Sequence, residues 1–434
     1  MVFYLFLFAV VFSFLANGGL TGITDVPSAL DALSRIASLL GTALLLMMLL
    51  LTARVPWIDA QFGQDVATDT HKRLGKPAFY LILAHFIFSL TSYAMTDGRD
   101  LLSELWFLMT TFEDLTKAVI SMVAMILVVV TSFKAVRRLL KYETWYLTHL
   151  LAYISVLFAI PHTFEMGTDL VSELSNAMWV FAFVFVGFNI LWFRVILPLT
   201  RSMASQVTVS KVTLESSDTV SLYLSGKKLS RFSAQPGQFM MVRFMTKKLW
   251  GQSHPFSLSA VPTDDQLRLT IGSRGDGSSV MQGIKPGTKV ILSGPFGVFT
   301  EAMRTNRKVV LIAAGIGIPP VRALAEGMAA NPGDIGILYR TRTSDDAPLA
   351  DELQELSELR GHHLEIASGA RPTNGNWLSH GSQTDAQRLT ELFPEIHTAD
   401  VYVCGPVSFT AAVKATLKEL KLPDSAIHSE EYAW

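Results

Sequence analysis

The sequence predicts a multi-domain membrane protein: an all-α six-helix transmembrane bundle, then an antiparallel β-barrel domain, then an α/β doubly wound domain. Three observations predict this order. Long apolar runs dominate residues 1–200. Residues 201–303 alternate apolar and polar positions between Gly and Pro turns, as barrel strands do. In residues 304–434, short apolar strands alternate with helical patterns, which is typical of a doubly wound sheet.

Six segments are apolar and about long enough to cross a bilayer: residues 2–16, 36–53, 76–95, 116–133, 144–163 and 177–198. The first is short and has no basic region before it, so we interpret it as a membrane span rather than a signal peptide. Basic residues gather in alternate short loops, near Arg54, Lys76 and Arg137, and acidic residues in the others. The positive-inside tendency therefore predicts a multi-pass protein of the cell (plasma or inner) membrane, with both termini and the soluble domains in the cytoplasm.

Composition narrows the classes of function. The formal net charge of −1 gives no sign of nucleic-acid binding. Cys404 is the single cysteine, which excludes an internal disulfide framework, a cysteine-built zinc site and a ferredoxin-type cluster. Any redox metal must therefore be held by histidines.

Four histidines lie in or just before two of the apolar segments: His85 in one, with His71 five residues before its start, and His149 and His162 in another. Each pair is separated by roughly 20 Å along a helix, at about 1.5 Å per residue. An imidazole in hydrocarbon is costly and usually marks function. We therefore expect His71 and His149 to hold an inner haem, and His85 and His162 an outer one. The second helix fits one face less well, and Pro161 provides for a kink there. The alternative is that these histidines are hydrogen-bonded packing residues.

Haem propionates need cationic partners. Lys72 and Arg73 follow His71 directly, and Arg35 lies at the outer end of the second expected span. We expect the first two beside the inner haem and Arg35 beside the outer one. Ordinary interfacial snorkelling explains the same residues equally well.

A phosphate-binding turn is expected in the last domain. The strand-like run "VVLIAAG" leads into Gly315, Gly317 and Pro319 and then into a helix. Glycines there let the backbone approach a pyrophosphate, which the helix N-terminus would face. Pro320 replaces the third glycine of the dinucleotide fingerprint, and a plain strand–turn–helix is the alternative. The ligand of such a domain lies beyond the carboxyl ends of its strands.

Several motifs together resemble a known family. The stretches "HPFSLSA" from His254, "GPFG" from Gly294, "AAGIGIPP" from Ala313, "CGP" from Cys404 and the terminal "EEYAW" resemble the ferredoxin–NADP reductase-like flavoprotein module. The membrane half, with "RVPW", "HKRLGKPAFYLILAH" and its paired histidines, resembles the six-helix domain of the NADPH oxidase and ferric reductase superfamily.

The resemblance implies cofactor contacts, which are expectations at this point. FAD would contact His254, Pro255, Phe256 and Ser257, and its pyrophosphate would lie at Arg274, Gly277 and Ser278. The nicotinamide nucleotide would lie at Gly315, Gly317, Pro319, Cys404, Gly405 and Pro406. Arg340 and Arg342 would read a 2′-phosphate, which favours NADPH and leaves NADH as the alternative.

Three of these residues are expected at the reacting atoms. Ser257 would donate to the flavin ring, Cys404 would face the nicotinamide, and Trp434 would stack on the flavin and swing aside. Purely structural alternatives remain for two of these residues and for the pyrophosphate segment. Cys404 could be a buried residue at a strand end, Trp434 could pack on the barrel, and residues 275–279 could form a simple β-turn.

The implied function is transfer of electrons from cytoplasmic NADPH, through FAD and two bis-histidine b-type haems, to an acceptor on the outer side. We expect the acceptor to be dioxygen, which would give superoxide. A ferric chelate is the alternative, as is a quinone or a periplasmic partner protein. The expected surroundings are the lipid bilayer, with no nucleic acid and no evident regulatory partner.

Overall fold

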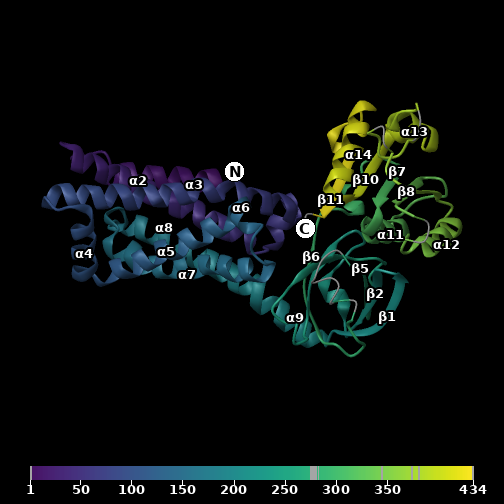
Figure 1. The fold of residues 1–434 in the computed structure, drawn as a ribbon, viewed down its shortest axis with the longest axis horizontal. Helices are drawn as coiled ribbons and strands as arrows, with labels where there is room; N and C mark the ends of the chain where they lie inside the picture. Colours follow the sequence, from purple (N-terminus) through teal and green to yellow (C-terminus); the bar gives the residue numbers. More distant parts are fainter. Residues whose placement is uncertain are drawn as a thin grey trace. The chain divides into compact units, whose positions relative to one another are not determined.

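The computed structural model describes residues 2–273, 281, 283–343, 346–372, 375–379 and 382–432 (Figure 1). The chain forms two compact units. The first contains Met1–Val55 and Val66–Leu191, and the second contains Pro56–Asp65 and Trp192–Trp434.

Helices make up the first unit. They are α1 (Val2–Ala16), α2 (Val26–Thr52), α3 (Pro56–Asp97) beyond residue 65, α4 (Leu101–Thr111), α5 (Glu113–Ser132), α6 (Lys134–Arg137), α7 (Tyr142–Met166), the 3-10 helix η1 (Thr168–Leu170) and α8 (Glu173–Leu191). Asp25 caps α2 and exchanges hydrogen bonds with Ser28 in a capping box. Asp100 caps α4 by accepting from two backbone N–H groups.

Within the described part of the chain, five helical segments are long and apolar enough to cross a membrane: Val26–Thr52, Val66–Asp97, Glu113–Ser132, Thr144–Met166 and Glu173–Ser205. They correspond to the second to sixth expected spans. Helix α1 is apolar but has 15 residues, or roughly 22 Å at 1.5 Å per residue, short of a hydrocarbon core of about 30 Å. The first expected span, residues 2–16, and with it the count of six, thus stays a prediction. The apolar α4 was not expected.

Small and polar residues set the close contacts between the long helices. A Cβ atom added to Gly41 on α2 would lie 2.8 Å from Cγ1 of Ile82 on α3, so glycine allows these helices to approach. On α5 and α7, Ser121 and Ser155 bond each other's backbone carbonyl oxygens at 2.7 and 2.8 Å. Their hydroxyl oxygens are 3.0 Å apart, and both residues are buried.

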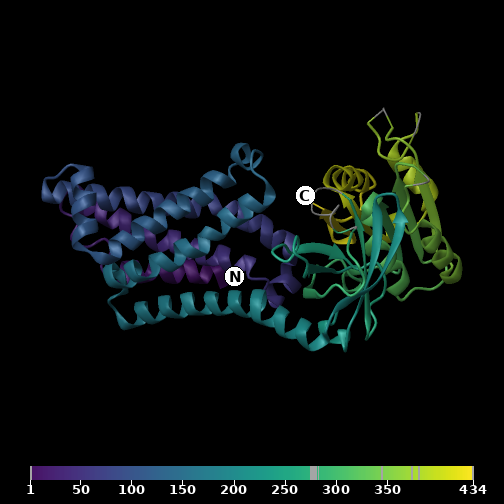
Figure 2. The same ribbon diagram turned by 60° about the horizontal axis from the view of Figure 1, so that its bottom comes forward.

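Both helical connections between the units are irregular. Helix α3 has non-helical backbone at Gly63, where φ is 76° and ψ is 153°. Helix α8 runs without a loop into the π-helix η2 (Trp192–Ile196) and then α9 (Leu197–Ser205) (Figure 2). Ser202 of α9 accepts from the backbone N–H of Leu292 at 2.9 Å, which fastens α9 to the strand that contains Leu292.

Two antiparallel sheets surround one core in the first part of the second unit. One has the order β1 (Thr208–Ser216), β2 (Thr219–Ser225), β5 (Gln266–Gly272), and the other the order β4 (His254–Ser257), β3 (Phe239–Phe244), β6 (Val290–Phe296). Leu222, Met240, Leu269 and Leu292 are fully buried between them. Among the described residues, isolated bridges such as Leu258 to Leu269 join the sheets. Antiparallel pairing is as expected, whereas closure into a barrel stays a prediction.

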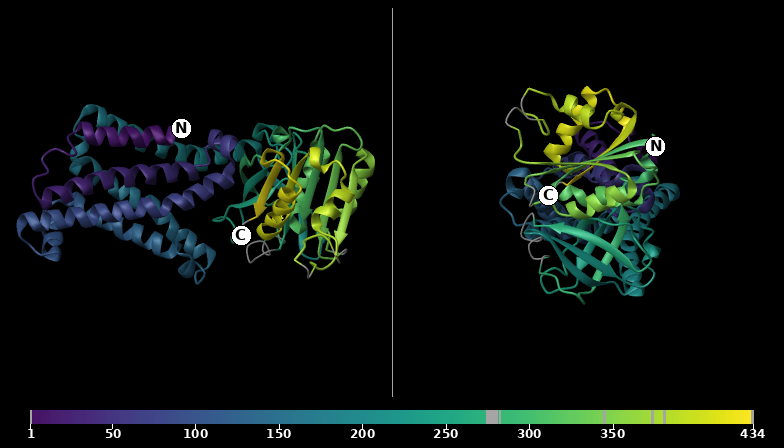
Figure 3. Two further views of the ribbon diagram at one scale, coloured as in Figure 1. Left: turned by 90° about the horizontal axis from the view of Figure 1, so that it is seen from above. Right: turned by 90° about the vertical axis from the view of Figure 1, so that its right-hand side faces the viewer.

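A parallel sheet of five strands forms the rest of this unit, in the order β11-β10-β7-β8-β9 (Figure 3). The strands are β7 (Lys308–Ala314), β8 (Ile335–Thr341), β9 (His363–Ser368), β10 (Ala399–Pro406) and β11 (Ile427–Tyr432). Helices α11 (Ile318–Gly327) and α12 (Ala350–Arg360) contribute to the core on one face, and α13 (Asp385–Leu392) and α14 (Val407–Glu419) to the core on the other. This is the doubly wound arrangement that the sequence predicts.

Buried charges connect the antiparallel sheets to the parallel one. Arg268 on β5 donates to Glu352 on α12 at 2.7 Å, and Arg322 on α11 pairs with the same carboxylate. Arg322 also pairs with Glu326, which accepts from the backbone N–H of Val261 at 2.7 Å. Burial by itself would lower the pKa of Arg268, but its bonds with Glu352 outweigh burial and raise it.

Candidate functional site

The structure brings the four membrane histidines together in two pairs. His71 on α3 lies beside His149 on α7, with ring centroids 6.1 Å apart and ring planes at 71°. His85 and His162, on the same two helices, also lie with ring centroids 6.1 Å apart, at 44°. The pairs are those expected from the sequence positions. Pro161 lies inside α7, which continues as a helix to Met166.

Neighbouring helices bond three of the four rings at Nδ1. The Nδ1 atom of His71 lies 3.3 Å from the carbonyl oxygen of Met48, and that of His149 lies 3.2 Å from the hydroxyl of Ser132. The Nδ1 atom of His85 lies 2.8 Å from the hydroxyl of Ser34. A carbonyl oxygen only accepts, so Nδ1 of His71 carries the proton and Nε2, which has the lone pair, is the atom available to a metal.

This geometry fits a metal held between two imidazoles. A coordinated imidazole nitrogen lies about 2 Å from its metal, and the ring centre lies about 1 Å further out, so two axial rings have centroids roughly 6 Å apart. Both observed separations are 6.1 Å. Ligating histidines commonly donate from their second ring nitrogen to an oxygen, as at His71. The donor set therefore suits iron porphyrin with two axial histidines.

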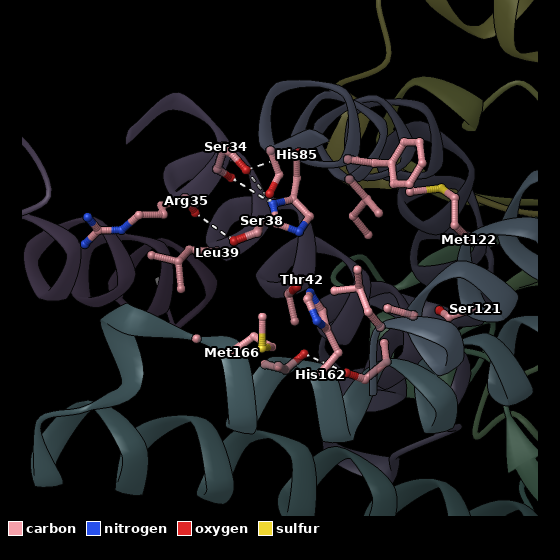
Figure 4. A pocket seen from close by; sticks show the side chains of 18 of the residues that line it. Ser34, Arg35, Ser38, Leu39, Thr42, His85, Ser121, Met122, His162 and Met166 are labelled. Atoms are coloured by element: carbon pink, nitrogen blue, oxygen red, sulfur yellow. Dashed lines mark hydrogen bonds between the residues drawn. The ribbon is translucent and has the colours of Figure 1, made fainter. Parts of the chain in front are cut away.

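A cavity adjoins the His85 and His162 pair. In Figure 4 the two rings point toward one another, with Ser34 behind His85. Apolar side chains such as Leu39, Leu46, Phe86 and Leu108 line much of this cavity. Its polar and charged lining residues include Asp31, Arg35, Ser38, Thr42, Tyr93 and Asp169.

Arg35 is engaged by a carboxylate. Its Nε donates to Oδ2 of Asp169 at 2.8 Å and its Nη2 to Oδ1 at 2.5 Å, and Asp169 is buried. In Figure 4 the guanidinium extends away from the two rings. Lys72 and Arg73 are exposed, and Arg73 pairs with Asp69 at 2.7 Å. The expected contacts of these three cations with propionates stay predictions.

Two expected nucleotide motifs meet at the carboxyl ends of the parallel strands. A Cβ atom added to Gly317 would lie 2.3 Å from the carbonyl oxygen of Cys404, so the turn after β7 presses against the end of β10. Gly315 has a φ of 52°, which glycine adopts readily. Cys404 is fully buried in the core, and Pro319 is buried on α11.

A cavity opens beyond the ends of β7, β8, β9 and β10. It is lined by Gly315, Arg340, Arg342 and Pro406 of the expected residues, and also by Arg371. Cys404, Gly405, Gly317 and Pro319 are absent from its lining and lie behind or beside it. The expected contact of Cys404 with nicotinamide stays a prediction.

The three arginines at this cavity differ in their exposure to solvent. Arg340 is 9% exposed and donates to the carbonyl oxygens of Trp377, Ala367 and Ala370 at 3.3, 2.9 and 2.8 Å, and to that of Thr341. It thus joins β8 to β9 and the segment that follows, and its burial lowers its pKa. Arg342 and Arg371, in contrast, are exposed.

The expected flavin-binding strand is β4. It pairs with β3, Met241 opposite Pro255 and Phe239 opposite Ser257. His254 and Phe256 stack on one face with centroids 6.3 Å apart, and Nε2 of His254 lies 3.0 Å from Oε1 of Gln252. Phe256 belongs to the core and Ser257 is buried. The expected residues Arg274, Gly277, Ser278 and Trp434 lie outside the described residues.

Sequence reasoning missed the residues that position the histidines, and it missed Arg371. Ser34, Met48 and Ser132 contact imidazole nitrogens from other helices, and a lone Ser or Met in a span carries no distinguishing signal. Arg371 follows the third strand of the doubly wound pattern, where the strand-end rule indicates a ligand residue.

Three family models match the chain in succession. They are a ferric reductase like transmembrane component at residues 37–160, an FAD-binding domain at 204–300 and an oxidoreductase NAD-binding domain at 311–415. They bear out the resemblance seen in the sequence.

Individual relatives share about half of the chain. The ferredoxin reductase component of 3-ketosteroid-9-alpha-monooxygenase from Rhodococcus rhodochrous is 26% identical over 235 residues, which are 52% of this chain and 64% of that protein. A flavohemoprotein of Bacillus subtilis is 28% identical over 236 residues, 51% of this chain and 57% of that protein. The chain thus spans less than two thirds of the length of either relative.

Among solved structures, the flavohem-like FAD/NAD-binding domain of nitric oxide dioxygenase from Vibrio cholerae is similar to 53% of this chain and 99% of its own, at 23% identity and a TM-score of 0.45. The family models make the chain a membrane flavoprotein oxidoreductase with FAD-binding and NAD(P)-binding domains. Their order along the chain matches the domain architecture of the NADPH oxidase and ferric reductase superfamily.

Proposed function

We propose that this protein moves electrons from cytoplasmic NADPH, through FAD and two b-type haems, to an acceptor on the outer side of the cell membrane. The observation that carries the proposal is the pair of opposed imidazoles found twice on α3 and α7, both with ring centroids 6.1 Å apart. Packing alone gives no reason for the same separation at two depths along the same two helices.

When bound, FAD supplies the conversion of a two-electron hydride into single electrons, and iron porphyrin supplies a one-electron carrier. The chain's own residues bind and orient these groups. His71 and His149 would hold the inner haem, and His85 and His162 the outer one. Because both imidazoles of the outer pair would hold the group, neither would be left to bind the acceptor.

The soluble unit would bind the nucleotides. The close contact of Gly317 with Cys404 keeps the turn after β7 low against the sheet, which leaves room for a pyrophosphate above it. Arg342 and Arg371 present exposed guanidiniums at the same cavity, and Arg340 adds its charge from behind. This cationic rim favours the 2′-phosphate of NADPH over NADH.

The orientation follows from the loop charges. Arg54, Lys76 and the cluster around Arg137 would lie in the cytoplasm, as would both termini and the nucleotide sites. The His85 and His162 pair would then lie toward the outer face, and each electron transferred would move charge across the membrane.

We propose dioxygen as the acceptor, with superoxide as the product. The apolar lining around Leu39, Phe86 and Leu108 suits a small uncharged molecule that reaches the outer pair. A ferric chelate is the second candidate. It is favoured by the charge of the same cavity, where Asp31 and Asp169 outnumber Arg35. Because Asp169 pairs with Arg35, this cation adds no unpaired positive charge to the cavity.

The decisive measurement is a count of haem and flavin in the purified protein, for which we expect two haems b per FAD. His85→Ala and His162→Ala should each lose the outer haem and acceptor reduction, while NADPH still reduces the flavin. Retention of both haems with acceptor reduction at the unmodified rate would refute the assignment. Cytochrome c reduction that superoxide dismutase suppresses indicates dioxygen as the acceptor, whereas direct reduction of a ferric chelate without oxygen indicates the second candidate.

A further inference from the structure

We propose that Ser34 is a positioning residue that tunes the outer pair by fixing the proton and the donor strength of His85. This inference rests on the proposed function, because it assigns a role toward a group bound by His85. Ser34 lies on α2, is 2% exposed, and reaches His85 across the contact between α2 and α3.

Three hydrogen-bond contacts join the two residues. The Ser34 hydroxyl oxygen lies 2.8 Å from Nδ1 of His85 and donates to the His85 carbonyl oxygen at 3.1 Å. The Ser34 carbonyl oxygen lies 3.2 Å from the same Nδ1 atom. Figure 4 shows this group of contacts behind the His85 ring.

The contacts fix where the protons lie. The hydroxyl has one proton, which the His85 carbonyl oxygen accepts, and the Ser34 carbonyl oxygen has none to give. Nδ1 must therefore donate, to the hydroxyl oxygen and to the carbonyl oxygen of Ser34. The lone pair of neutral His85 is consequently on Nε2, the atom available to a metal.

A glycine on α2 allows the close contact with α3 that places Ser34 beside His85. Gly41 lies seven residues after Ser34 on α2, and its position leaves no room for a Cβ atom against Ile82, three residues before His85. Two turns of helix separate Ser34 and Gly41, so they face α3 together. The close approach at Gly41 thus supports the short bond at Ser34.

The four histidines differ in the hydrogen bonding of their Nδ1 atoms. The bond of His85 to Ser34, at 2.8 Å, is shorter than those of His71 to Met48 and of His149 to Ser132, at 3.3 and 3.2 Å. Nδ1 of His162 is buried and, within the part of the chain that is described, has no hydrogen-bond partner. Hydrogen bonding at Nδ1 raises the basicity of a ligating imidazole. Of the four imidazoles, His85 would thus donate electron density to a bound metal most strongly. It would therefore stabilise the oxidised metal of the outer pair.

The test is a potentiometric titration of the two haems in the purified full-length protein. Ser34→Ala removes the hydroxyl with little change in volume, so we expect both haems to be retained and one of the two midpoint potentials to rise. Ser34→Thr keeps a hydroxyl and should restore the original potential. Ser38→Ala is the matched control, because Ser38 lies one turn further along α2 in the same cavity and donates to the Arg35 carbonyl oxygen instead.

The outcomes separate the two proposals. Two haems in the unmodified protein, with neither potential moved by Ser34→Ala, overturn the role of Ser34 alone. An equal shift in Ser38→Ala also overturns it, because the effect would then belong to the cavity in general. Fewer than two haems in the unmodified protein refutes the proposed function itself. If Ser34→Ala loses a haem, retention of that haem in Ser34→Thr supports the role, and loss in both variants contradicts it.

Discussion

The carbonyl oxygen of Cys404 lies where a side chain on Gly317 would have to be, since a Cβ atom there would be 2.3 Å away. The clash is with backbone of a buried strand, which cannot move aside as a flexible side chain can. We expect Gly317→Ala to destabilise the nucleotide domain by about 1–3 kcal/mol and to weaken NADPH binding. Reduction of the flavin by NADPH and thermal unfolding measure this. Gly251→Ala is the control, because no atom lies within 4 Å of its Cβ position. Similar behaviour of the two variants would contradict the argument.

Arg371 should discriminate between the two nicotinamide nucleotides. Arg371→Ala removes one exposed guanidinium from the cavity rim, and a charge-assisted hydrogen bond contributes about 1.5–3 kcal/mol. We expect KM for NADPH to rise roughly ten-fold or more, with KM for NADH nearly unchanged. Arg360→Ala, an exposed site at the end of α12, should change neither value. An equal rise in KM for both nucleotides in Arg371→Ala would show that this residue does not recognise the 2′-phosphate.

The carboxylate shared by Arg268 and Arg322 should hold the flavin and nucleotide parts together. Glu352→Gln leaves the buried guanidinium of Arg268 without its counter-charge and leaves Arg322 with Glu326 alone, so we expect a loss of about 2 kcal/mol in unfolding free energy. Hydride transfer from NADPH should slow as well, because the proposed FAD and NADPH sites lie on the two parts that this network joins. Glu355→Gln, exposed on the same helix, serves as control in thermal unfolding and in stopped-flow flavin reduction. Equal stability of the two variants would show that the network contributes nothing.

We expect low pH to destabilise the nucleotide-binding domain through protonation of Asp334. Arg307, at 3.1 Å, and Lys308, at 3.4 Å, lower the pKa of this carboxyl to about 2. Since the folded pKa lies below the ordinary value near 4, the stabilisation is complete above pH 4 and disappears as the pH falls toward 2. Asp334→Asn should lower the midpoint of thermal unfolding at pH 7 and flatten its dependence below pH 4. Glu419→Gln, which removes an exposed carboxylate, should keep the dependence of the unmodified protein.

The sequence predicts those features that depend on regular spacing. Apolar run length locates the long spans, and strand–helix alternation predicts the doubly wound sheet. The positions of His71, His85, His149 and His162 predict which rings face each other, because a straight helix fixes their depth. Helix α1 falls short by the same criterion of length, and the structure leaves its role as a span untested.

Contacts between residues that are far apart in the sequence could not be predicted from residue spacing. Arg340 and Arg342 lie at the same strand end, yet one donates inward to carbonyl oxygens and the other remains exposed. Residues two apart on a strand share a face, but β8 ends at Thr341, so Arg342 lies beyond the strand and the alternation does not extend to it. Arg340 is covered because it donates to Trp377 and Ala370 in the segment after β9. Likewise, the bond of Arg35 to Asp169 joins residues 134 positions apart, which no local pattern reveals.

The reciprocal serine contact between α5 and α7 determines how the histidines can move. Ser155 lies six residues after His149 and seven before His162, so it sits at the midpoint of the helix that carries both. A slip of α7 by one residue, about 1.5 Å, would break both carbonyl bonds in a region without water to replace them. The Ser121–Ser155 contact therefore opposes sliding of α7 along α5, and so it helps to keep both histidines at their depth.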